Sequence, residues 1–397
     1  QGRDLRGDEG TYVAMAASLA RDFDLDFADP DRAWAAEHPG GAVALILERT
    51  GRGLAYSKPV LYPVLAAPFV GLFGDWGATL LNLLVLLLAI WLSRAFLERL
   101  GEGAAARDTL LTFVAAGIVV PYVAWRMTET LQVALALAGL VLALSHRAPG
   151  APRESRPRAG WAERLVAHPG ADLLGGALLG FLISLREPNA LVAAVPVLAA
   201  LLRRDLRRGV RVGAAIGVAY LAALALTWTL TGAVNPYKAP RATFNAETGY
   251  PVGAGSATAL ARFDQPDELA TSSLVLTPLF DGGLSAYATL YFFVGRHTGL
   301  AIYFPAALFF AALALRRPHP AGMAALAGFF GLALFYLVWM PANFFGGETF
   351  LGNRYILAAY PCLLVALPRL PSRRLLLTVW TLAAVVGGSA LFSQLRS

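Results

Sequence analysis

The chain alternates between long apolar runs and short charged segments over most of its length. A transmembrane helix needs about 20 predominantly apolar residues. The pattern predicts ten membrane-spanning helices, at 76–97, 109–125, 129–146, 171–186, 189–202, 211–232, 298–315, 321–340, 354–369 and 374–394. The runs 171–186 and 189–202 are short, which favours a hairpin buried in a helical bundle. Pro59 to Gly74 contains three prolines and predicts a juxtamembrane or re-entrant segment.

The charged residues between the apolar runs predict which connections of the chain face the cytoplasm. Arginines gather in alternate connections, and cytoplasmic loops of membrane proteins carry such an excess. The connections assigned to the cytoplasm are 98–108, 147–170, 203–210, 316–320 and 370–373. Most acidic residues fall on the opposite side, including Asp22, Asp24, Asp264 and Glu268. Ten spans therefore satisfy the positive-inside rule, with the N-terminal segment outside.

Two segments on the predicted outer side are too long to be turns. Segment 1–58 forms the first external loop, and residues 10–21 in it have the spacing of an interfacial amphipathic helix. Segment 233–297 is a second external loop, rich in Gly, Pro, Asn and Asp from Asn235 to Ala270. Because the chain opens directly in an outer segment, we expect a first span to precede it.

Composition supports a membrane protein. Hydrophobic residues make up 57% of the chain and charged residues 15%, with a mean hydropathy of +0.57. Soluble domains carry about 25% charged residues, so the composition excludes a soluble α/β enzyme. The net charge of +7 comes from arginines in short loops, which indicates orientation signals and lipid contacts rather than nucleic-acid binding. Cys362 is the one cysteine, which excludes an intrachain disulfide and predicts a packed core thiol.

Two external motifs carry groups suited to catalysis. Asp8 and Glu9 follow a glycine just before the predicted helix 10–21. An acid there can act as general base for a hydroxyl or hold a metal beside a phosphate, although on spacing alone helix capping is the more frequent explanation. Lys58 is one of two lysines in the chain and precedes Pro59. Its charge suits a phosphate or a snorkelling membrane anchor.

Further polar residues lie at outer ends of predicted spans. Arg126 and Glu129 share a tight turn, where they either act in function or neutralise each other. A second outer turn holds Arg186, Glu187, Pro188 and Asn189. Two Gly-flanked segments, Gly295 to Gly299 and Gly346 to Tyr355, contain residues suited to phosphate, namely Arg296, His297, Asn353 and Arg354. For Arg354 and Tyr355, interfacial anchoring is the alternative.

These motifs share the outer side, where we expect their loops to converge on one pocket. An acid, a lysine and arginines around that pocket suit a lipid-phosphate donor attacked by a hydroxyl. The chain contains neither GxxxxGK[ST] nor a Rossmann GxGxxG after a strand. An enzyme acting outside the cytoplasm has no supply of nucleotide sugars, so a membrane-borne donor is the expected source of activated sugar.

The motifs resemble those of GT-C glycosyltransferases, close to the protein O-mannosyltransferase and aminoarabinose lipid A transferase group. Gly7-Asp8-Glu9-Gly10-Thr11-Tyr12 is similar to the family's first external loop. Lys58-Pro59-Val60-Leu61-Tyr62-Pro63 resembles a Lys/Pro-Pro-Leu-Tyr-Pro segment, with Val60 where a second proline is often found. Thr128-Glu129-Thr130-Leu131 and Gly352-Asn353-Arg354-Tyr355 with Pro361 resemble two further family segments. The sequence leads us to expect no counterpart of the large soluble domain of some relatives.

The resemblance implies an all-α polytopic protein with a GT-C-like transmembrane bundle over 1–397 and external juxtamembrane helices. It implies inverting sugar transfer from a polyprenyl-phosphate donor to an acceptor hydroxyl of a protein, lipid or glycan. Asp8 is the expected general base, with Glu9 as the alternative. The donor phosphate is expected to contact Lys58, Arg296, His297, Asn353 and Arg354. Support of the acceptor or of a divalent metal is expected from Glu129, Arg126, Tyr62 and Tyr355.

The expected location is the bacterial inner membrane, with the active site on the periplasmic side. Two other classes of protein remain open. A transporter or flippase would carry polar groups at mid-membrane, whereas these lie at outer ends. An inactive GT-C-like scaffold in a larger membrane complex would have no need of Asp8, Lys58 and Arg354.

Overall fold

The computed structural model describes residues 7–37, 45–50, 52–145, 160–234, 241–244, 282–296, 298–341 and 352–387. The chain divides into two compact units. The first unit comprises residues 1–84, 123–128 and 221–277, and the second comprises 85–122, 129–220 and 278–397. Each unit is described by itself below. A single GT-C-like domain over 1–397 stays a prediction.

The first unit combines helices with a small sheet. Its elements are α1 (Gly7–Arg21), α2 (Asp29–Glu37), β1 (Leu45–Thr50), β2 (Gly53–Tyr56), α3 (Leu61–Phe73) and β3 (Arg241–Phe244). The strand order is β2-β1-β3, and both pairings are antiparallel. The expectation of an all-α chain was therefore wrong in this region. The apolar alternation that marks β1 is three residues long, Leu45 to Leu47, which is too short to distinguish a strand from a loop.

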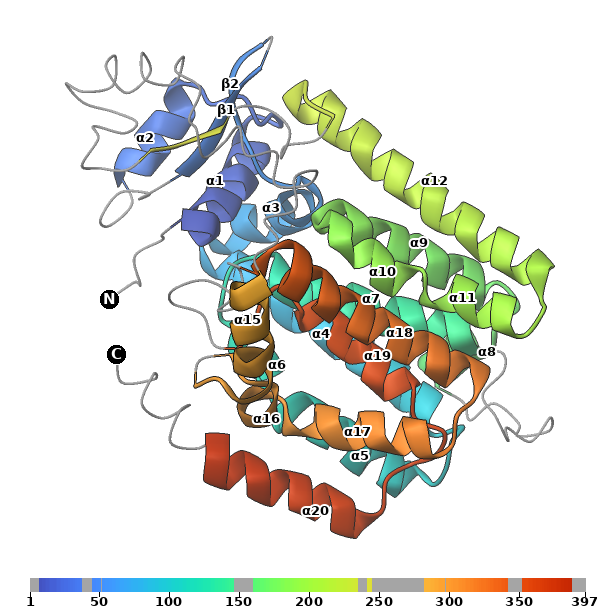
Figure 1. Cartoon of the computed structure of the whole chain (residues 1–397). Coiled ribbons are helices and arrows are strands. Elements are labelled where there is room, and N and C mark those ends of the chain that lie inside the picture. The colour runs from blue at the N-terminus through green and yellow to red at the C-terminus, as the bar shows by residue number, and fades with distance from the viewer. Residues whose placement is uncertain are drawn as a thin grey trace. The chain divides into compact units, whose positions relative to one another are not determined.

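Helix α1 confirms the prediction of a helix at 10–21 but not its amphipathic character. Every residue from Glu9 to Leu19 is buried, so protein covers this stretch of the helix on all sides. Helices α1 and α3 approach closely, since a Cβ added to Gly71 would lie 3.3 Å from the Ala20 Cβ. Figure 1 shows α1 and α3 beside the strands β1 and β2. An interfacial helix lying in lipid would have kept one polar face in water.

The second unit is a helical bundle. Its elements are α5 (Gly103–Ala115), α6 (Val119–Val123), α7 (Thr128–Leu144), α8 (Trp161–Ala167), α9 (Ala171–Leu185), α10 (Ala190–Ala193), α11 (Val195–Leu202), α15 (Gly282–Val294), α16 (Leu300–Tyr303), α17 (Pro305–Arg316), α18 (Pro320–Leu334), α19 (Tyr360–Val365) and α20 (Arg373–Leu382). Two further helices, α4 (Trp76–Leu97) and α12 (Leu206–Thr231), have residues in both units.

The core of the second unit forms around α18, which packs against α11 and α19 (Figure 1). Gly328 permits this approach, because a Cβ there would meet Val195 Cγ2 at 2.4 Å and Cys362 Sγ at 3.5 Å. Cys362 is fully buried, as expected for a packed core thiol. The rings of Phe304 and Tyr360 stack nearby with centroids 4.1 Å apart.

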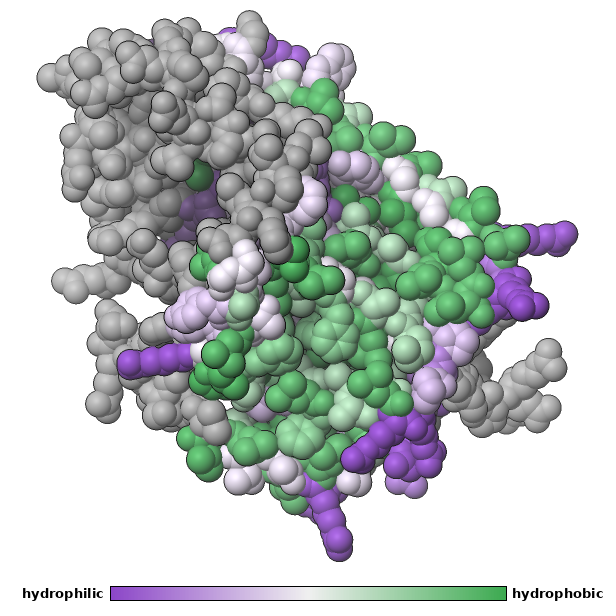
Figure 2. Space-filling model, in the orientation of Figure 1, coloured by the Kyte–Doolittle hydropathy of each residue, from purple (hydrophilic) through white to green (hydrophobic). Residues whose placement is uncertain are grey.

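The apolar helices make this an integral membrane protein. Among the described residues, α4, α12 and the stretch Pro320–Trp339, which continues α18, are long and apolar enough to cross a bilayer. A fourth span is counted if α8 and α9, bent by 95°, form one crossing. Figure 2 shows hydrophobic side chains over much of the visible face of the second unit. Leu315, Phe330 and Leu334 of this unit are exposed, as lipid-facing residues would be. The total of ten spans and the external juxtamembrane helices stay predictions.

Several predicted spans are interrupted. The span at 109–125 divides into α5 and α6, and the span at 298–315 divides into α16 and α17. The two breaks lie next to each other in the structure, because a Cβ added to Gly117 would lie 2.5 Å from the Phe304 ring. Hydropathy averages over a window, so it does not register a break made by one glycine and one aromatic ring.

The predicted external loop 233–297 contains regular structure. Its last part forms α15, a 13-residue apolar helix, and residues Arg241–Phe244 form β3. The end of the predicted span 374–394 lies outside the described residues, which there end at Gly387.

Candidate active-site residues

The first unit holds an acid–lysine pair that we call the Asp8 group, made of Asp8, Lys58 and Tyr12. Lys58 Nζ lies 2.6 Å from Asp8 Oδ1, and the two side chains are 9% and 23% exposed. The Tyr12 ring centroid is 6.0 Å from Lys58 Nζ. Asp8 belongs to the first turn of α1, where a negative charge is favourable. Lys58 follows β2, and Pro59 after it leads into α3.

This geometry holds a partly exposed carboxylate in a fixed place. A carboxylate that is partly exposed can meet the hydroxyl of a substrate, which a general base must do. The positive charge of Lys58 balances the negative charge of Asp8, so the pair has no net charge. Two residues that the sequence placed in separate roles, base and phosphate ligand, are therefore in direct contact.

Glu9 lies deeper than Asp8 and has a different partner. Its side chain is buried, and its Oε1 accepts a hydrogen bond of 3.3 Å from the backbone N–H of Arg126. The Arg126 guanidinium lies 3.5 Å from Asp75 and 5.5 Å from the centre of the Trp76 ring. Arg126 therefore pairs with Asp75 and does not neutralise Glu129, which was one of the two interpretations of this turn.

Tyr62 is a core residue of the first unit. It is fully buried, and its ring meets Tyr12 edge to face at 5.5 Å. Tyr12 thus contacts both Tyr62 and the lysine of the Asp8 group. A packing role explains Tyr62 as it lies here, and its support of an acceptor or metal stays a prediction.

The second unit holds a cationic cluster that we call the Arg186 group, made of Glu129, Arg186, Arg354 and Tyr355. Arg186 Nη2 lies 3.2 Å from Glu129 Oε1, with side chains 16% and 2% exposed. Its guanidinium also covers the Tyr355 ring at 4.6 Å. Its Nη1 donates to the backbone carbonyl of Arg354 at 3.5 Å. The Arg354 guanidinium lies 5.2 Å from the centre of the same ring.

Local structure places these residues. Glu129 is in the first turn of α7, and Arg186 is the residue after α9. Before the short helix Leu357–Ala359, Asn353 Oδ1 accepts the Tyr355 N–H at 3.0 Å and forms an Asx turn. Gly352 has a φ of +63°, a conformation that glycine adopts without strain. The Arg354 guanidinium from this turn and the Arg186 guanidinium from the end of α9 both contact the Tyr355 ring.

Arg186 was noted in the sequence as an outer-turn residue but was not assigned to the site. It touches Glu129, Arg354 and Tyr355, which were assigned. The signal in the sequence was an arginine at the end of an apolar run, where burial requires a partner. Next to it, Asn189 donates to Gln132 Oε1 at 2.9 Å, which joins α7 to the same turn.

Arg296 does not join the Arg186 group in the described part of the chain. Its side chain is exposed, and its backbone carbonyl accepts a 2.7 Å hydrogen bond from the Tyr303 hydroxyl. His297 lies outside the described residues. Their roles at a donor phosphate stay predictions.

A divalent metal has no obvious ligand set in the described residues. No three His, Cys, Asp or Glu side chains gather there in a way that would hold an ion. Asp8 is paired with Lys58, and Glu9 accepts a backbone N–H. We therefore derive no step through a metal.

Comparison with solved structures identifies the fold. No protein-family model matches the chain, and no curated protein does. The chain is similar to the crystal structure of ArnT from Cupriavidus metallidurans bound to undecaprenyl phosphate, with a TM-score of 0.52 and 17% identity. The match covers 99% of this chain and 59% of that one. The fold is GT-C-like.

Two weaker likenesses are to structures of the same kind. ArnT from the same organism in the apo state gives a TM-score of 0.49 at 17% identity, covering 99% of this chain and 58% of that one. Arabinosyltransferase EmbB from Mycobacterium smegmatis gives 0.40 at 14% identity, covering 99% and 36%. The chain thus spans 59% of the length of the first GT-C-like structure, so the likeness extends to the fold and not to the activity of the whole protein.

Proposed function

We propose that the protein transfers a sugar from a polyprenyl-phosphate donor to an acceptor hydroxyl at the periplasmic face of a bacterial inner membrane. The observation that carries the proposal is the Asp8 group, a partly exposed acid held 2.6 Å from a lysine in a GT-C-like chain. The solved ArnT structure is bound to undecaprenyl phosphate, which supports a polyprenyl donor here. The positive-inside pattern of the arginines supports the periplasmic face.

In the proposed reaction, Asp8 acts as general base. The acceptor oxygen attacks the anomeric carbon while its proton passes to the Asp8 carboxylate. The bond between that carbon and the phosphate oxygen breaks, and polyprenyl phosphate leaves with the electron pair. Attack from the face opposite the leaving group inverts the anomeric centre. The phosphate gains one negative charge in this step, so fixed cations stabilise the transition state more than the ground state.

Each charged group has a proposed role of its own. Lys58 orients Asp8 and becomes available to a phosphate once Asp8 has taken up a proton. Arg354 is a donor-phosphate ligand, because guanidinium forks bind phosphate oxygens in pairs. Arg186 positions Arg354 and Tyr355 through the contacts listed above, and Glu129 fixes Arg186 in turn.

The test is transfer of radiolabelled sugar from polyprenyl-phosphate donors in membranes that contain the full chain. Asp8→Asn keeps the shape of the side chain but removes the base, so transfer should fall by about 100- to 10,000-fold. Asp29→Asn is the matched control, because Asp29 is an acid of the same unit that is 94% exposed and pairs only at the surface. Arg354→Gln should mainly raise the KM for the donor.

Each outcome is decisive. Unchanged transfer by Asp8→Asn would remove Asp8 as base and make Glu9 the next candidate. An equal loss in Asp29→Asn would show that the effect is not specific to the Asp8 group. No transfer by the wild type, across a broad donor panel with cell-derived acceptors present, would favour a transporter or an inactive scaffold.

A further inference from the structure

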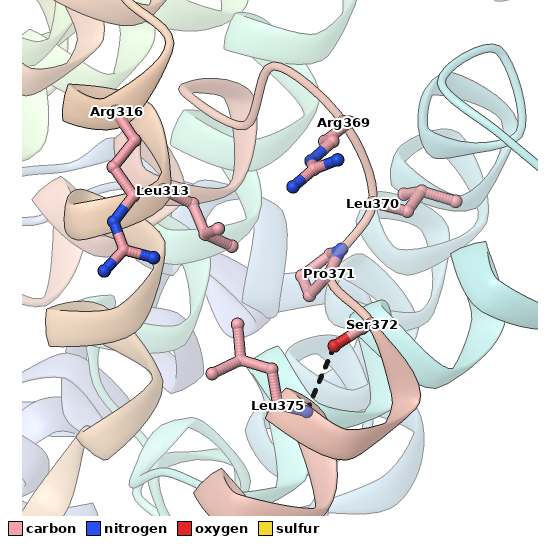
Figure 3. A pocket seen from close by; sticks show the side chains of 7 residues that line it. All are labelled: Leu313, Arg316, Arg369, Leu370, Pro371, Ser372 and Leu375. Atoms are coloured by element: carbon pink, nitrogen blue, oxygen red, sulfur yellow. Dashed lines mark hydrogen bonds between the residues drawn. The ribbon is translucent and has the colours of Figure 1, made fainter.

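A pocket in the second unit is lined by none of the residues of the Asp8 group or the Arg186 group. It has a volume of about 350 Å³ between the end of α17 and the segment that leads into α20 (Figure 3). Its apolar lining consists of Leu313, Leu370, Pro371 and Leu375, and the remaining lining residues are Arg316, Arg369 and Ser372. None of the seven residues is acidic. The pocket therefore has one apolar and one cationic part.

The walls of this pocket are held by packing. Leu370 lies against Gly101, where an added Cβ would meet the leucine Cδ1 at 2.8 Å. Helix α20 is tied to α5 by the hydrogen bond from Trp380 Nε1 to Thr112 Oγ1, 3.0 Å long. Ser372 Oγ accepts the N–H of Leu375 at 3.4 Å and so caps α20. The two arginines are the charged groups in the lining.

The two arginines come from different segments. Arg316 is the last residue of α17, and Arg369 precedes α20. Figure 3 shows the two guanidinium groups on opposite sides of the hollow, with Leu313 between them. Both side chains are exposed, and among the described residues no carboxylate forms an ion pair with either. Two cations at one small pocket whose seven lining residues include no acid indicate an anionic ligand.

The pocket also lies close to the start of a helix that is long and apolar enough to cross a bilayer. The apolar helix α17 ends at Arg316, and a helix long enough to cross the bilayer begins at Pro320. Three residues thus separate the pocket's arginine from the start of a span. A side chain at that position lies at the level of lipid headgroups. Arg317, Arg373 and Arg374 add positive charge to the same connections.

We propose that this pocket binds the phosphate of an anionic membrane phospholipid. The guanidinium groups of Arg316 and Arg369 hold the phosphate oxygens, and the apolar lining contacts the first part of the acyl chains. The apolar part of the pocket favours a lipid over a free phosphate ion. The bound lipid would join the end of α17 to the start of α20 on the arginine-rich side of the membrane. This site does not depend on the proposed transfer reaction.

The test is lipid binding to the full chain in detergent, measured by native mass spectrometry. The probe is phosphatidylglycerol, and diacylglycerol with the same acyl chains is the phosphate-free control. The Arg316→Gln/Arg369→Gln variant should bind phosphatidylglycerol at least about tenfold more weakly, because two cations at the surface of a site each contribute to anionic lipid binding. Binding of diacylglycerol should not change.

Arg317→Gln/Arg374→Gln is the matched control. It removes the same charge from neighbouring exposed positions that do not line the pocket, and it should bind phosphatidylglycerol within about twofold of the wild type. Equal losses in the two variants would overturn the proposal, since general surface charge would then explain binding. No preference of the wild type for phosphatidylglycerol over diacylglycerol would also overturn it.

Inorganic phosphate distinguishes the two sources of the anion. If it displaces phosphatidylglycerol as effectively as added lipid does, the site takes free phosphate and the lipid assignment is wrong. Arg316→Lys/Arg369→Lys guards against misfolding, because it keeps both charges but loses the bidentate forks. It should bind more weakly than the wild type and more tightly than the glutamine variant. Binding as weak as that of the glutamine variant in a folded protein would show that charge is not what holds the lipid.

Discussion

The Asp8 group and the Arg186 group are both built on a salt bridge, but their acids lie in different surroundings. In the first unit Asp8 is 23% exposed and its lysine is almost buried. In the second unit Glu129 is 2% exposed and its arginine is more accessible. The first group pairs one acid with one cation. The second sets two guanidinium groups and a tyrosine ring against one carboxylate.

This difference separates the chemistry that each group suits. A base has to meet a substrate hydroxyl, so the acid that reaches solvent is the better candidate. A buried carboxylate instead fixes the arginine beside it, and guanidinium groups held in this way suit a phosphate. The comparison favours Asp8 over Glu129 for proton transfer, and it favours the Arg186 group for donor binding.

The largest stability effect should come from Arg186→Met. This change leaves the Glu129 carboxylate buried without its arginine, and loss of one partner from a buried pair costs about 3 kcal/mol. The free energy of unfolding in detergent, measured by chemical denaturation, gives the value. The double variant Arg186→Met/Glu129→Gln should recover most of the loss, because no charge is left buried. A double variant no more stable than the single one would show that lost packing on Tyr355, and not the buried charge, sets the cost.

A smaller effect is expected from Lys58→Met in the first unit. Asp8 is partly exposed, so water solvates its carboxylate after the lysine is removed. The free energy of unfolding should fall by about 1 kcal/mol or less. Measured in the same detergent, a loss as large as that of Arg186→Met would break the comparison, since exposure of the acid would then not control the cost.

The smallest effect concerns pH, where the two units should respond in opposite directions. In the second unit, burial lowers the pKa of His319 below its usual 6.5, and Arg203 adds to the shift while the Ala366 carbonyl opposes it. The ring accepts the N–H of Gly322 at 3.1 Å, which requires a neutral imidazole. As pH falls, the unfolded chain therefore binds the proton at a higher pH than the folded chain does. The contribution of neutral His319 to the free energy of unfolding is present above about pH 6.5 and is lost as pH falls through the folded-state pKa.

In the first unit, burial raises the pKa values of Asp24 and Asp31 above 3.8. In the folded protein these two carboxyl groups bind protons more readily than in the unfolded chain. Their contribution to the free energy of unfolding therefore becomes less favourable as pH rises from 3.8 through the raised pKa values. Hydrogen exchange at about pH 7 and about pH 5.5 separates the units. Helix α18 should lose protection at the lower pH in the wild type but not in His319→Gln, and α2 should not lose protection. Equal acid sensitivity of α18 in both proteins would exclude His319 as the cause.

Much of the helical framework could be predicted from the sequence. The predicted span 76–97 matches α4 at both ends, and 321–340 and 211–232 lie almost wholly in helices that are long enough to cross a bilayer. These segments are uniformly apolar, so local hydropathy is sufficient. The strands of the first unit and the breaks at Gly117 and Phe304 depend on contacts between distant segments. No local window contains that information.

The sequence by itself determined a membrane protein, because bilayer solvation acts on each apolar segment separately. That the arginine-rich connections lie on one side and the acid, lysine and arginine motifs on the other stays a prediction from the charges. The sequence also singled out Asp8, Lys58, Glu129 and Arg354. Only the tertiary structure decided the pairs: Asp8 with Lys58, Arg126 with Asp75, and Glu129 with Arg186. A buried charge needs a partner, but its identity depends on which helix ends the packing of apolar faces brings together.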